Sequence, residues 1–224
     1  MSRKYNKTPV SIITGFLGSG KTTLIKALMN QPRMNDIALI INEFGEIGLD
    51  NLLVESSIEN TLLLENGCIC CSIRGDLIDT VIDLFTKVQN KTIPKFSRIL
   101  IETTGIAQPG PIANCFVVND VIARKCELHN IITLVDATQG IDQLVLHKEA
   151  KIQVAQSDLC LISKCDIGLV QEINELEGDL RKINPIAKIE RIENGQVDPI
   201  TLFQERDSLF VNRHLADGLE KKWT

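Results

Sequence analysis

The sequence predicts an α/β fold in which helices cover both faces of a mostly parallel sheet. Two observations support this prediction. Short apolar runs rich in β-branched residues recur along the chain, and stretches with the apolar spacing of helices lie between them. Strands that alternate with helices need crossover connections, which make the strands parallel and cover the sheet on both sides. The expected core strands are 10–13, 37–41, 99–101, 131–135 and 159–162.

The clearest helical patterns lie at 77–88 and 169–183, where apolar residues recur three or four positions apart. A third helix is expected at 24–30. No internal repeat, low-complexity tract or Pro/Gly/Ser-rich linker divides the 224 residues. A globule of this size can bury one large core, so we expect a single domain over 1–224.

Composition and charge narrow the function classes. The formal charge is −5 and the pI is about 5.3, so we expect neither nucleic acid nor an anionic membrane surface as a partner. The first ten residues are polar and resemble no signal peptide. Three of the seven cysteines crowd into positions 68–71, which favours a reducing compartment where thiolates bind metal. We therefore expect a cytoplasmic protein.

A glycine-rich loop follows the first expected strand and precedes the first expected helix. Its glycines let successive N–H groups point at phosphate oxygens, and the helix N-terminus adds the positive end of its dipole. Lys21 is expected to reach the β- and γ-phosphates, and the Thr22 hydroxyl to bind Mg²⁺. This is the arrangement of a P-loop. The residues expected around the nucleotide phosphates are Gly15, Gly18, Ser19, Gly20, Lys21, Thr22 and Thr23.

An acidic residue on a neighbouring strand is needed to hold the magnesium ion. Glu102 ends the strand at 99–101, and Gly105 behind it leaves room for the backbone to approach the γ-phosphate. The catalytic set is then Lys21, Thr22 and Glu102. The alternative is that Glu102 is a solvated glutamate at the end of an edge strand.

The choice of base is predicted from residues 163–166, which follow the strand at 159–162. The carboxylate of Asp166 can accept two hydrogen bonds from guanine, whereas adenine offers no such pair. Lys164 would lay its methylene stem along the base. The pattern favours GTP over ATP, although a Lys-x-Asp after a strand is a weak signal by itself.

The cysteine motif comprises Cys68, Cys70 and Cys71 in a predicted loop before the helix at 77–88. Thiolates at this density favour a transition metal, with Zn²⁺ foremost. A closed structural zinc site needs four protein ligands, so three thiols suggest an open site that can release its metal. Glu46 is the first candidate for a further ligand. The alternative is buried or redox-active thiols. The other cysteines, Cys115, Cys126, Cys160 and Cys165, are interpreted as core or loop residues, and His129 as a structural histidine.

Taken together, the chain resembles the CobW/HypB/UreG family of P-loop GTPases, and within it the CobW-like branch. The resemblance extends over about 10–195. The matching stretches are TGFLGSGKTTL (14–24), NEFGE (42–46), NGCICCSIRGDL (66–77), ETTG (102–105) with Pro109 behind it, VDA (135–137), and the pair Lys164 and Asp166.

The resemblance implies slow GTP hydrolysis and a metallochaperone or metal-cofactor insertase that binds zinc, cobalt or nickel. It assigns the metal role to the three clustered cysteines and implies a switch region at 42–50. It also implies a client metalloprotein as partner and a nucleotide-dependent homodimer. Within the switch region, Glu43, Glu46 and Asp50 are the candidates for positioning the attacking water.

Three features depart from the family pattern. Ser163 replaces the usual asparagine of the guanine motif, which predicts a weaker contact between loops. Ile41 stands where some relatives carry an acidic ligand. The sequence ends at Thr224, and we therefore expect no C-terminal domain or histidine-rich stretch of the kind found in many CobW-like proteins. The leading hypothesis is a carrier whose metal affinity depends on the bound nucleotide. A GTP-dependent interaction switch with a structural or sensory metal, and a redox role for Cys70 and Cys71, are the alternatives.

Overall fold

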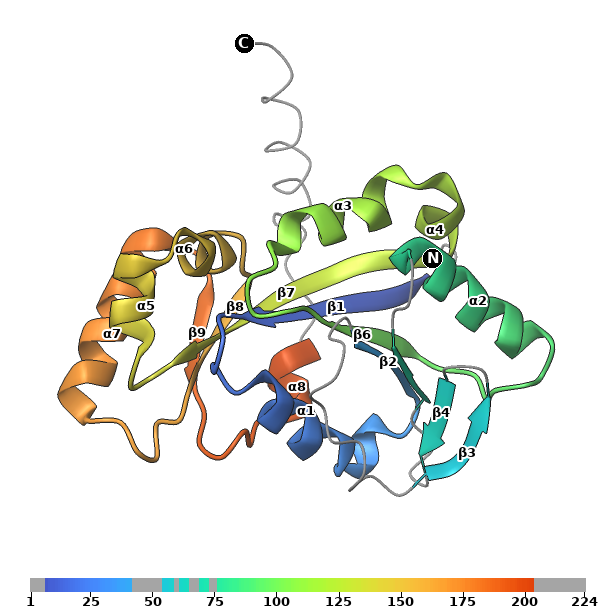
Figure 1. The fold of residues 1–224 in the computed structure, drawn as a ribbon, viewed down its shortest axis with the longest axis horizontal. Helices are drawn as coiled ribbons and strands as arrows, with labels where there is room; N and C mark the ends of the chain where they lie inside the picture. The colour runs from blue at the N-terminus through green and yellow to red at the C-terminus, as the bar shows by residue number, and fades with distance from the viewer. Residues whose placement is uncertain (1–6, 42–53, 59–60, 65–68, 73–75, 204–224) are drawn as a thin grey trace, which may run out of the picture.

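The computed structural model describes residues 7–41, 54–58, 61–64, 69–72 and 76–203, the three short middle segments by their backbone. The strands in this part of the chain form one sheet in the order β3-β4-β5-β2-β6-β1-β7-β8-β9 (Figure 1). The strands are β1 (Thr8–Gly15), β2 (Ile37–Ile41), β3 (Val54–Ile58), β4 (Thr61–Leu64), β5 (Ile69–Ser72), β6 (Arg98–Glu102), β7 (Cys126–Asp136), β8 (Leu159–Ser163) and β9 (Lys188–Arg191).

The five predicted core strands are confirmed as β1, β2, β6, β7 and β8. They pair in parallel with one another, and β5 and β9 extend the parallel sheet on either side. At one edge β4 pairs antiparallel with β5, and β3 pairs antiparallel with β4. The prediction of a mostly parallel sheet is therefore confirmed, with an antiparallel edge that the apolar runs did not reveal.

Helices cover both faces of the sheet. On one face α1 and α8 pack against β1, β2, β7 and β8, and on the other α2, α3 and α4 cover the central strands while α5, α6 and α7 cover β7 and β8 (Figure 1). The helices are α1 (Lys21–Met29), α2 (Leu77–Gln89), α3 (Pro109–Val118), α4 (Asp120–Lys125), α5 (Gly140–Leu146), α6 (Lys148–Ala155), α7 (Val170–Ile183) and α8 (Pro199–Phe203), with a 3₁₀ turn at η1 (Pro32–Met34).

The two strongest helical patterns are confirmed as α2 and α7. Asp76 caps α2 by accepting a hydrogen bond of 2.8 Å from the Ile78 backbone N–H, which satisfies one of the free donors at a helix start. Val81 and Leu84 are buried against the sheet from α2, and Leu176 and Leu180 from α7. Apolar residues at this spacing form one continuous stripe, which is why the pattern alone predicted both helices.

The carboxyl ends of the parallel strands meet at one edge of the sheet. Ser72 of β5, Ile41 of β2, Glu102 of β6 and Ile13 of β1 lie in successive register with one another. Ligands of such sheets bind beyond this edge. The loops that follow β1, β6 and β8 therefore lie where the sequence predicts a nucleotide.

None of the helices in the described ranges has the length and apolar character needed to cross a membrane.

Candidate nucleotide-binding site

The predicted phosphate loop runs from the end of β1 to the start of α1. Gly15 has φ 145° and lies so close to β7 that an added Cβ would be 2.5 Å from Leu134 O, and Gly20 has φ 90° where the helix begins. A side chain would be strained at either position, because positive φ favours glycine. The local sequence therefore dictates a tight curl of backbone ahead of the α1 N-terminus, as anion binding requires.

Lys21 arches back over this loop. Its Nζ donates hydrogen bonds to Gly15 O at 2.9 Å and Phe16 O at 3.3 Å, and the side chain is buried. Thr22, in the same first turn of α1, is half-buried. A positive ammonium group and a hydroxyl-bearing residue thus stand side by side in the sequence where the loop meets α1, the position at which the phosphates and the magnesium ion are predicted.

The loop after β6 lies directly beside the phosphate loop. Glu102 is fully buried and pairs with Ile13 across the β1–β6 ladder. Beyond it, Thr103 N donates to Ile13 O at 3.0 Å and Thr103 Oγ1 to Thr14 Oγ1 at 2.9 Å. Gly105 approaches so closely that a Cβ there would be 2.9 Å from Leu17 N. Glu102 and Thr22 supply hard oxygen ligands, the type that Mg²⁺ prefers, so the donors fit the predicted ion.

The predicted base loop is held to the phosphate loop by Ser163. Its Oγ donates a hydrogen bond of 2.7 Å to Ser19 O. The sequence predicted a weakened contact at this position, but the serine makes a short bond to the loop. Lys164 adopts φ 58°, a conformation that is uncommon for a residue with a side chain and is maintained only by its surroundings. Asp166 is exposed, with Oδ1 3.4 Å from Asn194 N.

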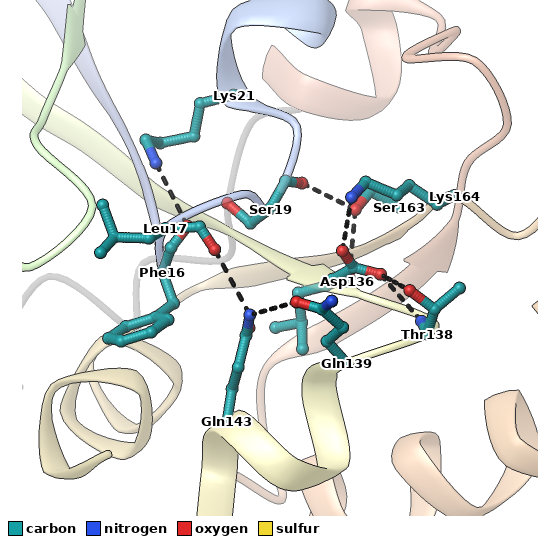
Figure 2. A network of polar contacts seen from close by, with 11 residues as sticks. Phe16, Leu17, Ser19, Lys21, Asp136, Thr138, Gln139, Gln143, Ser163 and Lys164 are labelled. Atoms are coloured by element: carbon teal, nitrogen blue, oxygen red, sulfur yellow. Dashed lines mark hydrogen bonds and ion pairs between the residues drawn. The ribbon is translucent and has the colours of Figure 1, made fainter. Parts of the chain in front are cut away.

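Asp136 at the end of β7 belongs to the VDA stretch (135–137) of the family resemblance, but no role in the site was predicted for it from the sequence. Its buried carboxylate accepts hydrogen bonds from Lys164 Nζ at 2.6 Å and from the N and Oγ1 of Thr138, both at 2.8 Å (Figure 2). Burial alone would raise the pKa of Asp136, but these hydrogen bonds and the Lys164 charge outweigh it and lower the pKa. Asp136 therefore stays ionised and fixes the direction of the Lys164 side chain.

A family comparison agrees with this geometry. Residues 9–191 match the model of the CobW/HypB/UreG nucleotide-binding domain. The chain belongs to this family.

Known members of the CobW/HypB/UreG family provide closer comparisons. The chain is 37% identical over 198 residues to the zinc chaperone YjiA of Escherichia coli, covering 88% of this chain and 61% of that protein. It is 31% identical to the zinc-regulated GTPase metalloprotein activator 1 of Schizosaccharomyces pombe, covering 89% and 49%. The chain thus spans about half to three-fifths of the length of these relatives.

Solved structures of the CobW/HypB/UreG family share the fold. The crystal structure of Zn(II)-bound YjiA GTPase from E. coli superposes with a TM-score of 0.77 at 35% identity, covering 89% of this chain and 62% of that one. HypB from Helicobacter pylori in complex with nickel gives a TM-score of 0.54 at 17% identity, covering 98% and 90%. The second likeness concerns the fold alone.

The cysteine motif of this CobW/HypB/UreG chain lies partly on a strand. The sequence interpretation as a loop is wrong for residues Ile69–Ser72, which form β5. In that strand Cys70 pairs with Leu39 and Cys71 with Ile40 of β2, so sheet pairing fixes the backbone at both cysteines. Cys68, Glu46 and the predicted switch region at 42–50 lie outside the described residues, and the proposed metal ligand set stays a prediction.

The other four cysteines of this CobW/HypB/UreG chain lie in core or loop positions, as predicted. Burial raises the pKa of Cys126 to about 12 and of Cys160 to about 11, and it also raises the pKa of Cys115 and Cys165. Thiols of this kind stay protonated at neutral pH, whereas metal ligation requires thiolate. Among the described residues no cluster of three or more metal-ligating side chains occurs.

Helices α5 and α6 contact the phosphate loop, a feature that sequence reasoning missed. The Phe16 and His147 rings stack with centroids 4.4 Å apart, and Gln143 Nε2 donates to Leu17 O at 3.3 Å. Figure 2 shows Gln143 reaching from α5 toward Leu17, with Gln139 beside it. No local pattern identifies these contacts, because an isolated glutamine in an amphipathic helix ordinarily faces solvent.

Proposed function

We propose that this chain is a GTP-hydrolysing metallochaperone domain whose affinity for a transition metal depends on the bound nucleotide. The register at the carboxyl edge of the sheet is the observation that supports this proposal best. Ser72, next to Cys71, aligns with Ile41, which aligns with Glu102 beside the phosphate loop. Strands lie about 4.8 Å apart, so the backbone at the end of the cysteine strand is about 10 Å from that at Glu102. A metal held there would lie close to the phosphates.

GTP is the proposed nucleotide. Asp166 offers two carboxylate oxygens to the guanine edge, and Ser163 and Lys164 connect its loop to the phosphate loop and to Asp136. Lys21, Thr22 and Glu102 form the proposed hydrolytic set. Thr22 and Glu102 would hold Mg²⁺, which when bound neutralises charge on the phosphates. Lys21 would add its ammonium charge to the same oxygens.

Zinc is the proposed metal, since the relatives named above are a zinc chaperone and a zinc-regulated activator. Cys68, Cys70 and Cys71 are the proposed ligands, with Glu46 as a fourth. A nucleotide can control release only if the two nucleotide states differ in metal affinity. The proposed recipient is a client metalloprotein, and a homodimer that forms in the presence of GTP is the proposed assembly.

A metal titration tests this proposal. Zinc affinity of the purified chain is measured under reducing conditions with a non-hydrolysable GTP analogue and with GDP, for the wild type, Cys70→Ala and Cys115→Ala. Cys115 lies on α3, outside the cysteine motif, and its Sγ donates a hydrogen bond to Pro111 O. Its variant is therefore the matched control. We expect the zinc affinity to differ roughly tenfold or more between the two nucleotide states. Cys70→Ala should lose zinc binding, and Cys115→Ala should bind zinc as the wild type does. Equal affinity in both states would favour the interaction switch with a structural metal.

Nucleotide binding and turnover are tested separately. The wild type should bind GTP in preference to ATP and release phosphate slowly, whereas Lys21→Ala should lose phosphate release. A chain that binds no triphosphate would overturn the whole proposal. Transfer is then tested by mixing the zinc-loaded GTP form with a metal-free client, and dimerisation by light scattering with each nucleotide.

A further inference from the structure

Gln153 on α6 holds the loop that follows Glu102. Its side chain is fully buried, and Nε2 donates hydrogen bonds to Gly105 O at 3.1 Å and Ala107 O at 2.9 Å. Both partners are carbonyl oxygens, so only the NH₂ end of the amide can face them. The side-chain Oε1 is buried and has no hydrogen-bond partner among the described residues. The hydrogen bonds that the side-chain amide donates thus go to this loop alone.

These bonds fix the direction of the loop peptides. The Gly105 carbonyl points at α6, and in a trans peptide the following N–H of Ile106 must point the opposite way. The Thr104 carbonyl accepts from Ala107 N at 3.1 Å, so the N–H of Gly105 is likewise turned outward from that turn. Gly105 also packs closely against Leu17 of the phosphate loop. The loop is therefore anchored from α6 and in contact with the phosphate loop.

Gln153 is itself fixed by the sheet. Thr133 Oγ1 on β7 donates to the Gln153 backbone carbonyl at 3.0 Å in the protein interior. On the preceding helix α5, Gln143 donates to Leu17 O, and His147, between α5 and α6, stacks on Phe16. The α5–α6 pair therefore contacts both loops that are expected to surround the γ-phosphate, and Gln153 is the buried contact to the second of them.

We propose that Gln153 is a positioning residue that presents the N–H groups of the Gly105 loop to the third phosphate of GTP. The inference rests on the proposed function, because it assumes a nucleotide in the phosphate loop. GDP lacks the third phosphate, so loss of the Gln153 bonds weakens GTP binding and turnover but leaves GDP binding nearly unchanged. The residue sets the preference between GTP and GDP without touching either nucleotide.

Two variants test the inference. Gln153→Glu keeps the shape of the side chain but places carboxylate oxygens against two carbonyls, and Gln153→Met keeps the length without a donor. Each should weaken binding of a GTP analogue by roughly tenfold or more, since a lost hydrogen bond of about 1.4 kcal/mol corresponds to a factor of ten. GDP affinity should stay within about twofold, as expected for a group that acts on the γ-phosphate alone.

Gln156→Ala is the matched control. Gln156 lies just beyond the same helix, and its Oε1 accepts from Gly110 N at 3.0 Å, outside the Gly105 turn. Its ratio of GTP to GDP affinity should equal the wild-type ratio. Melting curves of the same variants report any packing defect. Such a defect would lower the affinities for GTP and GDP together, whereas a positioning defect lowers the affinity for GTP alone. If both Gln153 variants keep the wild-type ratio, the inference is overturned while the proposed function stands. If the wild type binds neither nucleotide, the proposed function fails first.

Discussion

Ser163 Oγ lies 2.7 Å from Ser19 O and donates a hydrogen bond to it in the protein interior. One residue ends β8 and begins the predicted base loop, and the other belongs to the phosphate loop. An added Cβ at Gly20 would also meet the Ser163 side chain at 3.7 Å, so the two loops pack as well as bond. The loops predicted to hold the base and the phosphates are therefore joined by a hydrogen bond and by packing.

Replacing Ser163 with alanine should weaken GTP and GDP binding together. The Ser19 carbonyl would lose a buried donor, which costs about 1–3 kcal/mol, or roughly 5- to 150-fold in affinity if the loss is expressed entirely in binding. Both nucleotides should be affected because both are expected to contact both loops. Titration with fluorescent GTP and GDP analogues measures the change.

Ser157→Ala is the control for this prediction. Ser157 Oγ also donates a buried bond of 2.7 Å, but to Val154 O away from the site. It should lower the melting temperature without changing nucleotide affinity. Full nucleotide affinity in Ser163→Ala would show that the loop contact does not contribute to binding.

Replacing Asp136 with asparagine should lower stability at neutral pH and free the Lys164 side chain. Three hydrogen bonds reach the Asp136 carboxylate. Bonds to charged groups contribute about 1.5–3 kcal/mol each in favourable cases, and the partial exposure of Lys164 reduces this. We expect a total loss of about 1–2 kcal/mol, with weaker guanine nucleotide binding. Chemical denaturation and nucleotide titration measure the two effects.

The pH dependence of this loss has a definite sign. The folded-state pKa of Asp136 lies below its ordinary value, so the carboxylate stabilises the fold above about pH 4, where it is also ionised in the unfolded chain. This contribution fades as the pH falls through the folded pKa. The stability gap between wild type and Asp136→Asn should therefore be constant near neutrality and shrink below about pH 4. Asp179→Asn removes the exposed pair with Lys182 and should change stability little.

The parts of the fold that follow from local pattern could be predicted from the sequence. The core strands are continuous apolar runs, and α2 and α7 are apolar stripes, so burial alone identifies them. β9 reads KIER, with three charged residues, and β3 reads VESSI, and neither contains an apolar run. Such strands exist because neighbouring strands offer hydrogen bonds, which is a tertiary effect that local propensity does not contain.

The site divides in the same way. Lys21, Thr22 and Glu102 could be proposed from the sequence because a glycine loop and a strand end predict where their side chains lie. A role for Asp136 could have been proposed by the same rule, since it ends β7 as Glu102 ends β6. Gln153 could not, because its role depends on α6 folding back over a loop 46 to 48 residues earlier in the chain.

The cysteines should divide into two reactivity classes. Cys126 and Cys160 have pKa values of about 12 and 11 because they are buried, and almost no thiolate is present at pH 8. In the native, metal-free chain, fast alkylation should therefore be confined to Cys68, Cys70 and Cys71, and zinc should protect these. All seven cysteines of the sequence should react after unfolding. Mass spectrometry of samples taken at successive times and then digested distinguishes the two classes. Rapid labelling of Cys126 or Cys160 in the native chain would contradict this prediction.

Replacing Gly105 with alanine should impair the site by forcing apart the two loops that are predicted to face the phosphates. The new Cβ would lie 2.5 Å from Leu17 Cδ2 and 2.9 Å from Leu17 N. The exposed leucine side chain can rotate away, but the backbone nitrogen moves only if the phosphate loop moves. We expect GTP analogue affinity to fall by roughly tenfold, the effect of about 1.4 kcal/mol, with a parallel loss of phosphate release.

A second glycine provides the comparison for Gly105→Ala. Gly178 lies inside α7, and a Cβ there would meet nothing within 4 Å. Gly178→Ala should raise stability by about 0.5–1 kcal/mol, because alanine loses less entropy in a helix, and it should leave nucleotide binding unchanged. The double variant Gly105→Ala with Leu17→Ala should recover only part of the affinity, since it removes the side-chain contact and keeps the backbone one. Complete recovery would show that the alanine at position 105 clashes with the Leu17 side chain and not with the backbone of the phosphate loop.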